Sequence, residues 1–257
     1  MSVYTSYDMV MDCQAGKAEG WQYLVQRFMP ALRAMARHYG GGEETAMRLI
    51  QSVHRLEGFK PAPERQVLIE LRPSLLKECG WTGGQDRTLD LETLVEALEP
   101  LTAVERQLAW FETMDYTSQE AAQLLHVSEE TAAKAWQKAR EALRAKLDHW
   151  TVALLKENGG NLAGDVRAQV PAEPVPVRVH LDLIDGRLTW RDRTEVDHKL
   201  TASWYEIDHL CRVREADEAL RHAATLTEEE TAACLRQLNL PVPKAKTNWL
   251  KRLVGAR

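Results

Sequence analysis

The stretch that decides the fold is 117–147, TSQEAAQLLHVSEETAAKAWQKAREALRAKL. Thr117, followed three residues later by Glu120, forms a capping-box pattern, which predicts the start of a helix. Ser128 is a second N-cap residue, so only the pair 126–127, His-Val, separates two predicted helices. A long second helix after so short a turn is the geometry of a helix-turn-helix, whose second helix can enter the DNA major groove.

The second predicted helix has an apolar face and a charged face. Its apolar residues recur at spacings of four, three and four, which places them on one buried face. They are Ala132, Trp136, Ala139 and Leu143. The candidate DNA contacts lie at the helix start and on the other face. They are Ser128, Glu130, Thr131, Lys134, Gln137, Lys138 and Arg140. Basic residues there would contact phosphates; the alternative is a solvated face whose first turn only caps the helix.

The preceding segment, 98–111, LEPLTAVERQLAWF, has the apolar spacing of a further helix. The whole of 98–147 resembles the promoter-recognition domain of extracytoplasmic-function sigma factors of bacterial RNA polymerase. The matching residues are Leu101, Glu105, Arg106, Ser118, Ala122, Leu125, Ser128, Thr131, Ala139, Arg140, Leu143 and Arg144. This resemblance implies promoter DNA as a partner. His126 replaces a usual glycine, and Ala133 and Ala135 replace residues that are usually basic or polar.

Residues 1–80 resemble the other domain of the same family, which binds polymerase. The matches in the first helical segment are Ala15, Gly16, Trp21, Leu24, Pro30, Leu32 and Ala36. The resemblance also implies a polymerase-docking face on a helix over 43–56. The residues of that face are Leu49, Ile50, Gln51 and Val53. Arg48 and Ser52 stand where the family usually has acidic residues, and Arg48 would repel a basic partner surface.

The C-terminal region begins with a Gly- and then Pro-rich stretch, 158–178, which predicts a linker. Segment 181–213 resembles the zinc-binding anti-sigma domain through Asp185, Gly186, Leu188, Thr189, Arg193, Val196 and Leu200. The family's metal positions are occupied by Lys199, Ser203 and Glu206, so the resemblance implies a zinc-free relative.

Residues 180–211 contain three histidines and a cysteine, residue types that can bind zinc. These residues are His180, His198, His209 and Cys211. Their spacing fits no common structural zinc site, so we expect no metal and no cofactor. A basic tail, 236–257, ends the chain with six basic residues and no acidic one.

Composition limits the classes of function. The 257 residues suffice for two or three small domains, and the net charge of -5 argues against DNA binding by bulk charge alone. The sequence has no signal peptide and no apolar run long enough for a membrane span, and its four cysteines are widely separated. We therefore expect a cytoplasmic protein with no membrane contact. No catalytic motif is present, so we expect no enzyme.

These patterns predict an all-α fold with two sigma-like helical domains and a smaller, mostly helical C-terminal module. The predicted boundaries are 1–80 for the polymerase-binding domain, 81–96 for a linker, 97–157 for the helix-turn-helix domain, 158–178 for a second linker, and 179–257 for the anti-sigma-like module with its basic tail.

The predicted function is that of a sigma-like transcription regulator that binds the RNA polymerase core and promoter DNA. A fold-back of the C-terminal module would make it self-inhibited, and an anti-sigma or other regulatory protein is a further expected partner. The alternative is a degenerate sigma-like adaptor or interaction protein that no longer initiates transcription.

Overall fold

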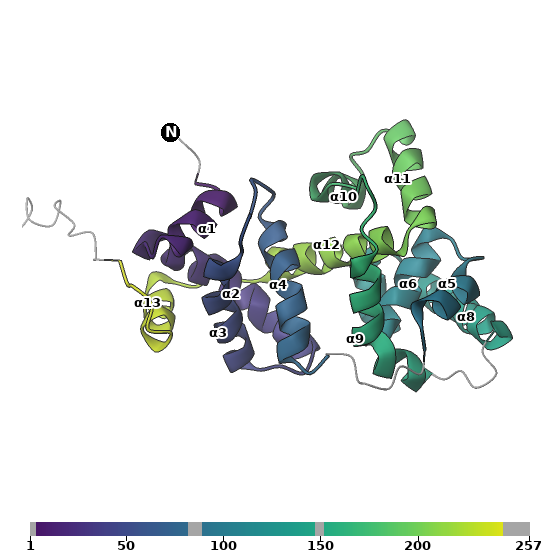
Figure 1. Cartoon of the computed structure of the whole chain (residues 1–257), viewed down its shortest axis with the longest axis horizontal. Helices are drawn as coiled ribbons and strands as arrows, with labels where there is room; N and C mark the ends of the chain where they lie inside the picture. Colours follow the sequence, from purple (N-terminus) through teal and green to yellow (C-terminus); the bar gives the residue numbers. More distant parts are fainter. Residues whose placement is uncertain (1–3, 82–88, 147–151, 244–257) are drawn as a thin grey trace, which may run out of the picture.

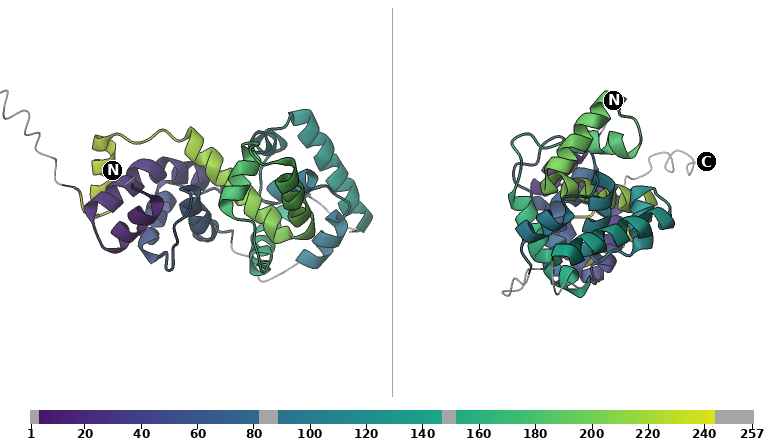
Figure 2. Two further views of the ribbon diagram at one scale, coloured as in Figure 1. Left: turned by 90° about the horizontal axis from the view of Figure 1, so that it is seen from above. Right: turned by 90° about the vertical axis from the view of Figure 1, so that its right-hand side faces the viewer.

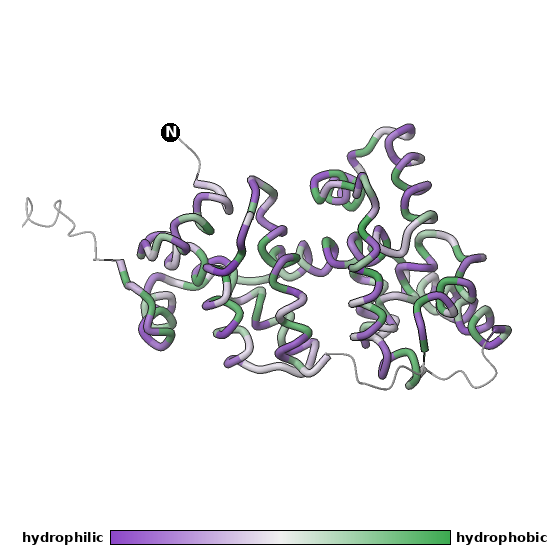
Figure 3. The backbone as a smooth tube through the Cα atoms, in the orientation of Figure 1, coloured by the Kyte–Doolittle hydropathy of each residue, from purple (hydrophilic) through white to green (hydrophobic). Residues whose placement is uncertain are grey.

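The computed structural model describes residues 4–81, 89–146 and 152–243, and every regular element within these ranges is helical. The predicted all-α class is therefore confirmed. In Figure 1 the helices form two lobes side by side, and helix α12 runs between them. Apolar residues alternate with polar ones along most helices (Figure 3), as expected for helices that bury one face in a shared core.

The N-terminal lobe contains the first four α-helices and a short 3-10 helix. They are α1 (Ser6–Gln14), α2 (Ala18–His38), α3 (Glu43–Ser52), η1 (Val53–Arg55) and α4 (Arg65–Glu78). Helix α13 (Glu228–Gln237), from the far end of the chain, packs against α2. Thr227 and Glu230 form the capping box that starts α13.

The second lobe is built around the predicted helix-turn-helix. Its helices are α5 (Leu91–Leu98), α6 (Ala103–Thr113), α7 (Ser118–Leu125), α8 (Glu129–Lys146) and α9 (Val152–Ala168). Thr117 and Glu120 form the capping box of α7. His126 ends α7 in the left-handed region, at φ 56° and ψ 40°, and this produces the tight bend before α8. We call α5–α9 the helix-turn-helix lobe.

The predicted boundaries before this lobe need correction. Part of the expected linker 81–96 is helix α5, because Asp90 caps it through the Thr93 amide and leucines bury its inner face. Residues 82–88 of that linker lie outside the described part of the chain. The helix expected over 98–111 begins only at Ala103, where Thr102 and Glu105 form a further capping box.

The expected linker 158–178 is also wrong over its first half, which belongs to α9. Two glycines of α9, Gly159 and Gly160, allow the helix to pass very close to other backbone. A Cβ atom on Gly160 would lie 2.1 Å from the carbonyl oxygen of Trp81, and one on Gly159 would lie 2.5 Å from that of Thr113. Glycine-rich composition therefore marks close packing here rather than chain flexibility.

The C-terminal region does not form a separate module at 179. After α10 (Val177–Ile184) and α11 (Trp190–Ala202), helix α12 (Trp204–His222) packs against α2 and α4 of the N-terminal lobe and against α6, α7 and α9 of the other. The view from above in Figure 2 shows α12 spanning the junction of the lobes. The part of the predicted basic tail beyond residue 243 lies outside the described residues.

A buried carboxylate on α12 joins the two lobes. Glu215 accepts hydrogen bonds from the hydroxyls of Tyr39, at the end of α2, and Tyr116, between α6 and α7. Arg72 on α4 donates its Nε to the same carboxylate at 2.5 Å and its Nη2 to the Tyr39 hydroxyl at 3.0 Å. Burial raises the pKa of both tyrosines, so their hydroxyls stay protonated as donors.

The first prediction tests the close packing of α9. Gly160→Ala should destabilise the protein by about 1–3 kcal/mol, because the new methyl group would displace backbone. Gly164→Ala in the same helix is the control: nothing lies within 4 Å of its Cβ position, so the change should stabilise by about 0.5–1 kcal/mol. Urea unfolding would measure both. Equal effects of the two substitutions would contradict this packing.

The second prediction tests the buried carboxylate. Glu215→Gln keeps the side-chain shape but leaves the Arg72 guanidinium, 2% exposed, without its nearest counter-charge. We expect a loss of roughly 3–5 kcal/mol in the free energy of unfolding. Glu218→Gln, three residues along α12 and about one-third exposed, should change stability by less than about 0.5 kcal/mol. A loss of similar size in both variants would contradict the special role of Glu215.

Candidate nucleic-acid interface

Helix α8 has the two faces that its sequence predicts. Trp136 is 5% exposed and Leu143 is fully buried, and the helix packs through this side onto α5, α6 and α7. The side chains of Lys134 and Lys138 are 73% and 51% exposed. The structure therefore presents the predicted charged stripe to solvent while the tight bend at His126 is kept.

The polar residues at the start of α8 bond to one another. The Ser128 hydroxyl accepts the backbone N–H of Thr131 at 3.2 Å, and the two hydroxyls are 2.8 Å apart. Glu130 pairs with Lys134 one turn later at 2.6 Å. Ser128 thus caps the helix, and Glu130 pairs with Lys134, one of the two lysines of the charged stripe.

The second lysine is also paired, with a residue of α6. Lys138 Nζ lies 2.9 and 3.0 Å from the two carboxylate oxygens of Glu105, the residue that completes the capping box with Thr102. Burial acts to raise the pKa of Glu105, but the Thr102 amide and Lys138 outweigh it, and the pKa is lowered. Gln137, also exposed, donates to Glu141 at 3.1 Å.

Arg140 differs from the other candidate DNA contacts. It is half-buried, and its guanidinium carbon lies 5.1 Å from the centre of the Trp136 ring. It lines a groove of about 400 Å³ that runs between the start of α7, at Ser118, and the α8 residues Ala133 and Gln137. The accessible part of Arg140 therefore borders this groove.

The predicted polymerase-docking face requires correction. Leu49, Ile50 and Val53 are at most 1% exposed, because α3 and η1 pack these side chains into the core of the N-terminal lobe. Only Gln51 is exposed, and its side-chain amide donates to the carbonyl of Leu238 after α13, at 3.0 Å. Apolar spacing identified a buried face, and that face contacts this chain itself.

Arg48, which stands where the resemblance would have an acidic residue, is neutralised within the lobe. Its Nε lies 2.7 Å from Glu78 on α4, and its Nη1 lies 3.6 Å from Glu44. The exposed surface of α3 thus carries ion pairs rather than an unpaired cation.

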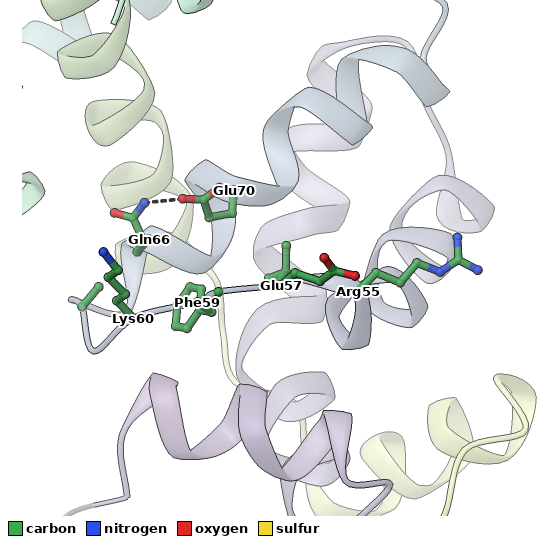
Figure 4. Close-up of a pocket in the computed structure, with 9 residues that line it drawn as sticks. Arg55, Glu57, Phe59, Lys60, Gln66 and Glu70 are labelled. Carbon is green, nitrogen blue, oxygen red and sulfur yellow. Dashed lines mark hydrogen bonds between the residues drawn. The ribbon is translucent and has the colours of Figure 1, made fainter. Parts of the chain in front are cut away.

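The N-terminal lobe also has a surface hollow of about 530 Å³ between η1 and the start of α4. Figure 4 shows its labelled side chains, of which Gln66 donates to Glu70 at 2.7 Å. Arg55 points away from this pair, so the polar groups do not converge on one point. The hollow offers no constellation of the kind that catalysis requires.

Sequence spacing missed one cluster. The fold brings His180 of α10 against Glu206 and His209 of α12, all three buried, although the sequence led us to expect no metal ligands here. The only signal in the sequence was the three-residue separation of Glu206 and His209, which places both on one face of a helix. His198 is exposed, and Cys211 does not belong to the cluster.

Comparison with protein-family models, with characterised proteins and with solved structures finds no match to this chain. Among the helices of the described ranges, none combines the length and apolarity that a membrane span requires.

The third prediction concerns the pairing of Lys138 with Glu105. Glu105→Gln retains a capping-box side chain but frees Lys138 and removes a negative charge, so DNA affinity should rise about two- to fivefold. Glu195→Gln on α11, a remote and exposed carboxylate, should leave the affinity unchanged. Fluorescence anisotropy with a labelled duplex would measure both.

The same variant has a pH signature. Since the pKa of Glu105 is lowered by folding, its carboxylate stabilises the native state at neutral pH, and this contribution disappears as the pH falls through the folded pKa. The stability difference between wild type and Glu105→Gln should therefore vanish in acid. A difference that persists below that range would contradict the pairing.

Proposed function

We propose that this protein is a sigma-like, non-enzymatic DNA-binding regulator that contacts promoter DNA through α8. The supporting observation is the exposed stripe of Thr131, Lys134, Gln137 and Lys138 on the second helix of a helix-turn-helix. A helix whose apolar face packs on its own domain and whose polar face is exposed can fit into a DNA major groove.

The charge of this stripe supports weak, regulated binding rather than strong nonspecific binding. Both lysines are paired with glutamates, and a phosphate must compete with those glutamates for each cation. Few net phosphate contacts imply a shallow dependence of affinity on salt.

In this proposal, helix α12 holds the two lobes at a fixed distance from each other. A protein that touches polymerase with one lobe and DNA with the other must set the distance between them. We infer that α12 does so, and that the C-terminal helices act as a clamp on the lobes rather than as a cover over α8, whose lysines remain exposed.

The competing proposal is an adaptor that has lost promoter binding. Two observations favour it: the pairing of Lys134 and Lys138 with glutamates, and the burial of Leu49, Ile50 and Val53, which leaves no apolar docking face on α3. This protein would use its rigid two-lobed form to hold another protein.

The fourth prediction separates the two proposals. Under the first, Lys134→Ala and Lys138→Ala should each weaken duplex DNA binding and each lower the slope of log affinity against log salt by about 1. Lys199→Ala on α11 removes the same charge away from α8 and should change neither quantity.

A companion measurement is transcription in vitro with core RNA polymerase and a library of promoters. Specific initiation that depends on Lys134 and Lys138 supports the regulator. A salt slope near zero for the wild type, together with no initiation, would establish the adaptor instead.

A further inference from the structure

Three buried side chains of the C-terminal helices converge on one point. His180 Nε2 lies 3.5 Å from Glu206 Oε2, and His209 Nδ1 lies 3.9 Å from the same oxygen. The candidate ligand atoms of the three residues all lie within 4.8 Å of one another. His180 and Glu206 are at most 1% exposed, and His209 is 7% exposed.

Polar atoms in this cluster lack hydrogen bonds within the described protein. Glu206 Oε1 accepts the backbone N–H of Val175 at 2.9 Å, but its Oε2 accepts none. Both ring nitrogens of His180 and Nδ1 of His209 are likewise unbonded. Leaving buried polar groups unsatisfied is costly. His180 Nε2 and His209 Nδ1 both lie near Glu206 Oε2, and three such atoms around one point indicate a shared ligand.

The chemistry of the cluster selects a cation. The two imidazole rings meet edge to face with their centres 4.9 Å apart. Neutral imidazoles offer lone pairs, and the buried Glu206 carboxylate supplies negative charge. Two imidazoles and one carboxylate form a donor set typical of zinc and other divalent transition metals.

Two nearby arginines would repel a bound cation. Arg212 is largely neutralised, because its Nε lies 2.8 Å from a carboxylate oxygen of Asp208. Arg214 is directed elsewhere, to the side-chain oxygen of Gln107 and the carbonyl of Leu124. Direct coordination by two imidazoles and the Glu206 carboxylate acts against the remaining repulsion.

We propose that His180, Glu206 and His209 bind one divalent transition-metal ion, with zinc as the best match. Ligand atoms around tetrahedral zinc lie about 3.4 Å apart, so small side-chain rotations bring all three into range. This set shares only Glu206 with the metal positions implied by the sequence resemblance, because Lys199 and Ser203 do not belong to the cluster. The metal joins α10 to α12, the helix that connects the two lobes.

The fifth prediction is one zinc ion per folded chain, measured by equilibrium dialysis of the full-length protein and elemental analysis. Free zinc at about 100 times the dissociation constant should raise Tm by roughly 5–10 °C. Cobalt substituted for zinc should give an absorption spectrum with nitrogen and oxygen ligands and no thiolate band.

Variants test the ligand set. His180→Ala and His209→Ala should abolish stoichiometric binding, and the isosteric Glu206→Gln should weaken it about 10- to 100-fold while circular dichroism shows a folded chain. His222→Ala is the matched control, because it removes an exposed histidine that lies 3.2 Å from Glu218 on the same helix. It should bind zinc like the wild type.

Two results would overturn the proposal. One is a folded wild-type chain that binds no zinc at micromolar concentration. The other is undiminished binding by the double variant His180→Ala/His209→Ala. Neither result bears on DNA binding through α8, so the metal site and the proposed function can fail separately.

Discussion

The structure depends on the burial of one carboxylate between parts of the chain that are far apart in sequence. Glu215, 4% exposed, receives hydrogen bonds from Tyr39, Arg72 and Tyr116, which belong to two different lobes. A buried charge is tolerated only when its donors are all in place. Separating the lobes would remove donors from Glu215 and leave charges unpaired in an apolar interior, so this network resists their relative motion.

Helix α12, which holds Glu215 between the lobes, has an unusual composition. Thirteen of its 19 residues are buried, including the charged residues Glu206, Asp208, Arg212, Glu215 and Asp217. A helix that is polar on all sides usually lies in solvent or bridges domains. Helix α12 bridges the two lobes, and the partners of its charged side chains come from both. These polar contacts therefore fix the relative position of the lobes, which nonspecific apolar packing would not do.

The α8 face shows the opposite arrangement. Lys134 and Lys138 are exposed but are paired with Glu130 and Glu105, so this stripe is charged without a strong net field. Exposed pairs of this kind contribute little to stability and can exchange partners at small cost. The two helices therefore differ in how they use charge. The charges of α12 belong to a fixed, buried network, whereas those of α8 are exposed and can exchange their partners for a ligand.

Local patterns determined the capping box at Thr117 and the bend at His126, because each depends on residues within about one turn of helix. They also determined the all-α class, because apolar periodicity depends only on residues within one helix. Tertiary structure decided the rest. Glycines in α9 resembled a linker until the backbone they approach was known. Leu49 has the same sequence spacing whether it docks a partner or fills a core. Helix α12 has the composition of an exposed helix, and only the packing of both lobes around it shows that most of it is buried. Periodicity reports which face of a helix is buried, but only the packed chain shows what buries it.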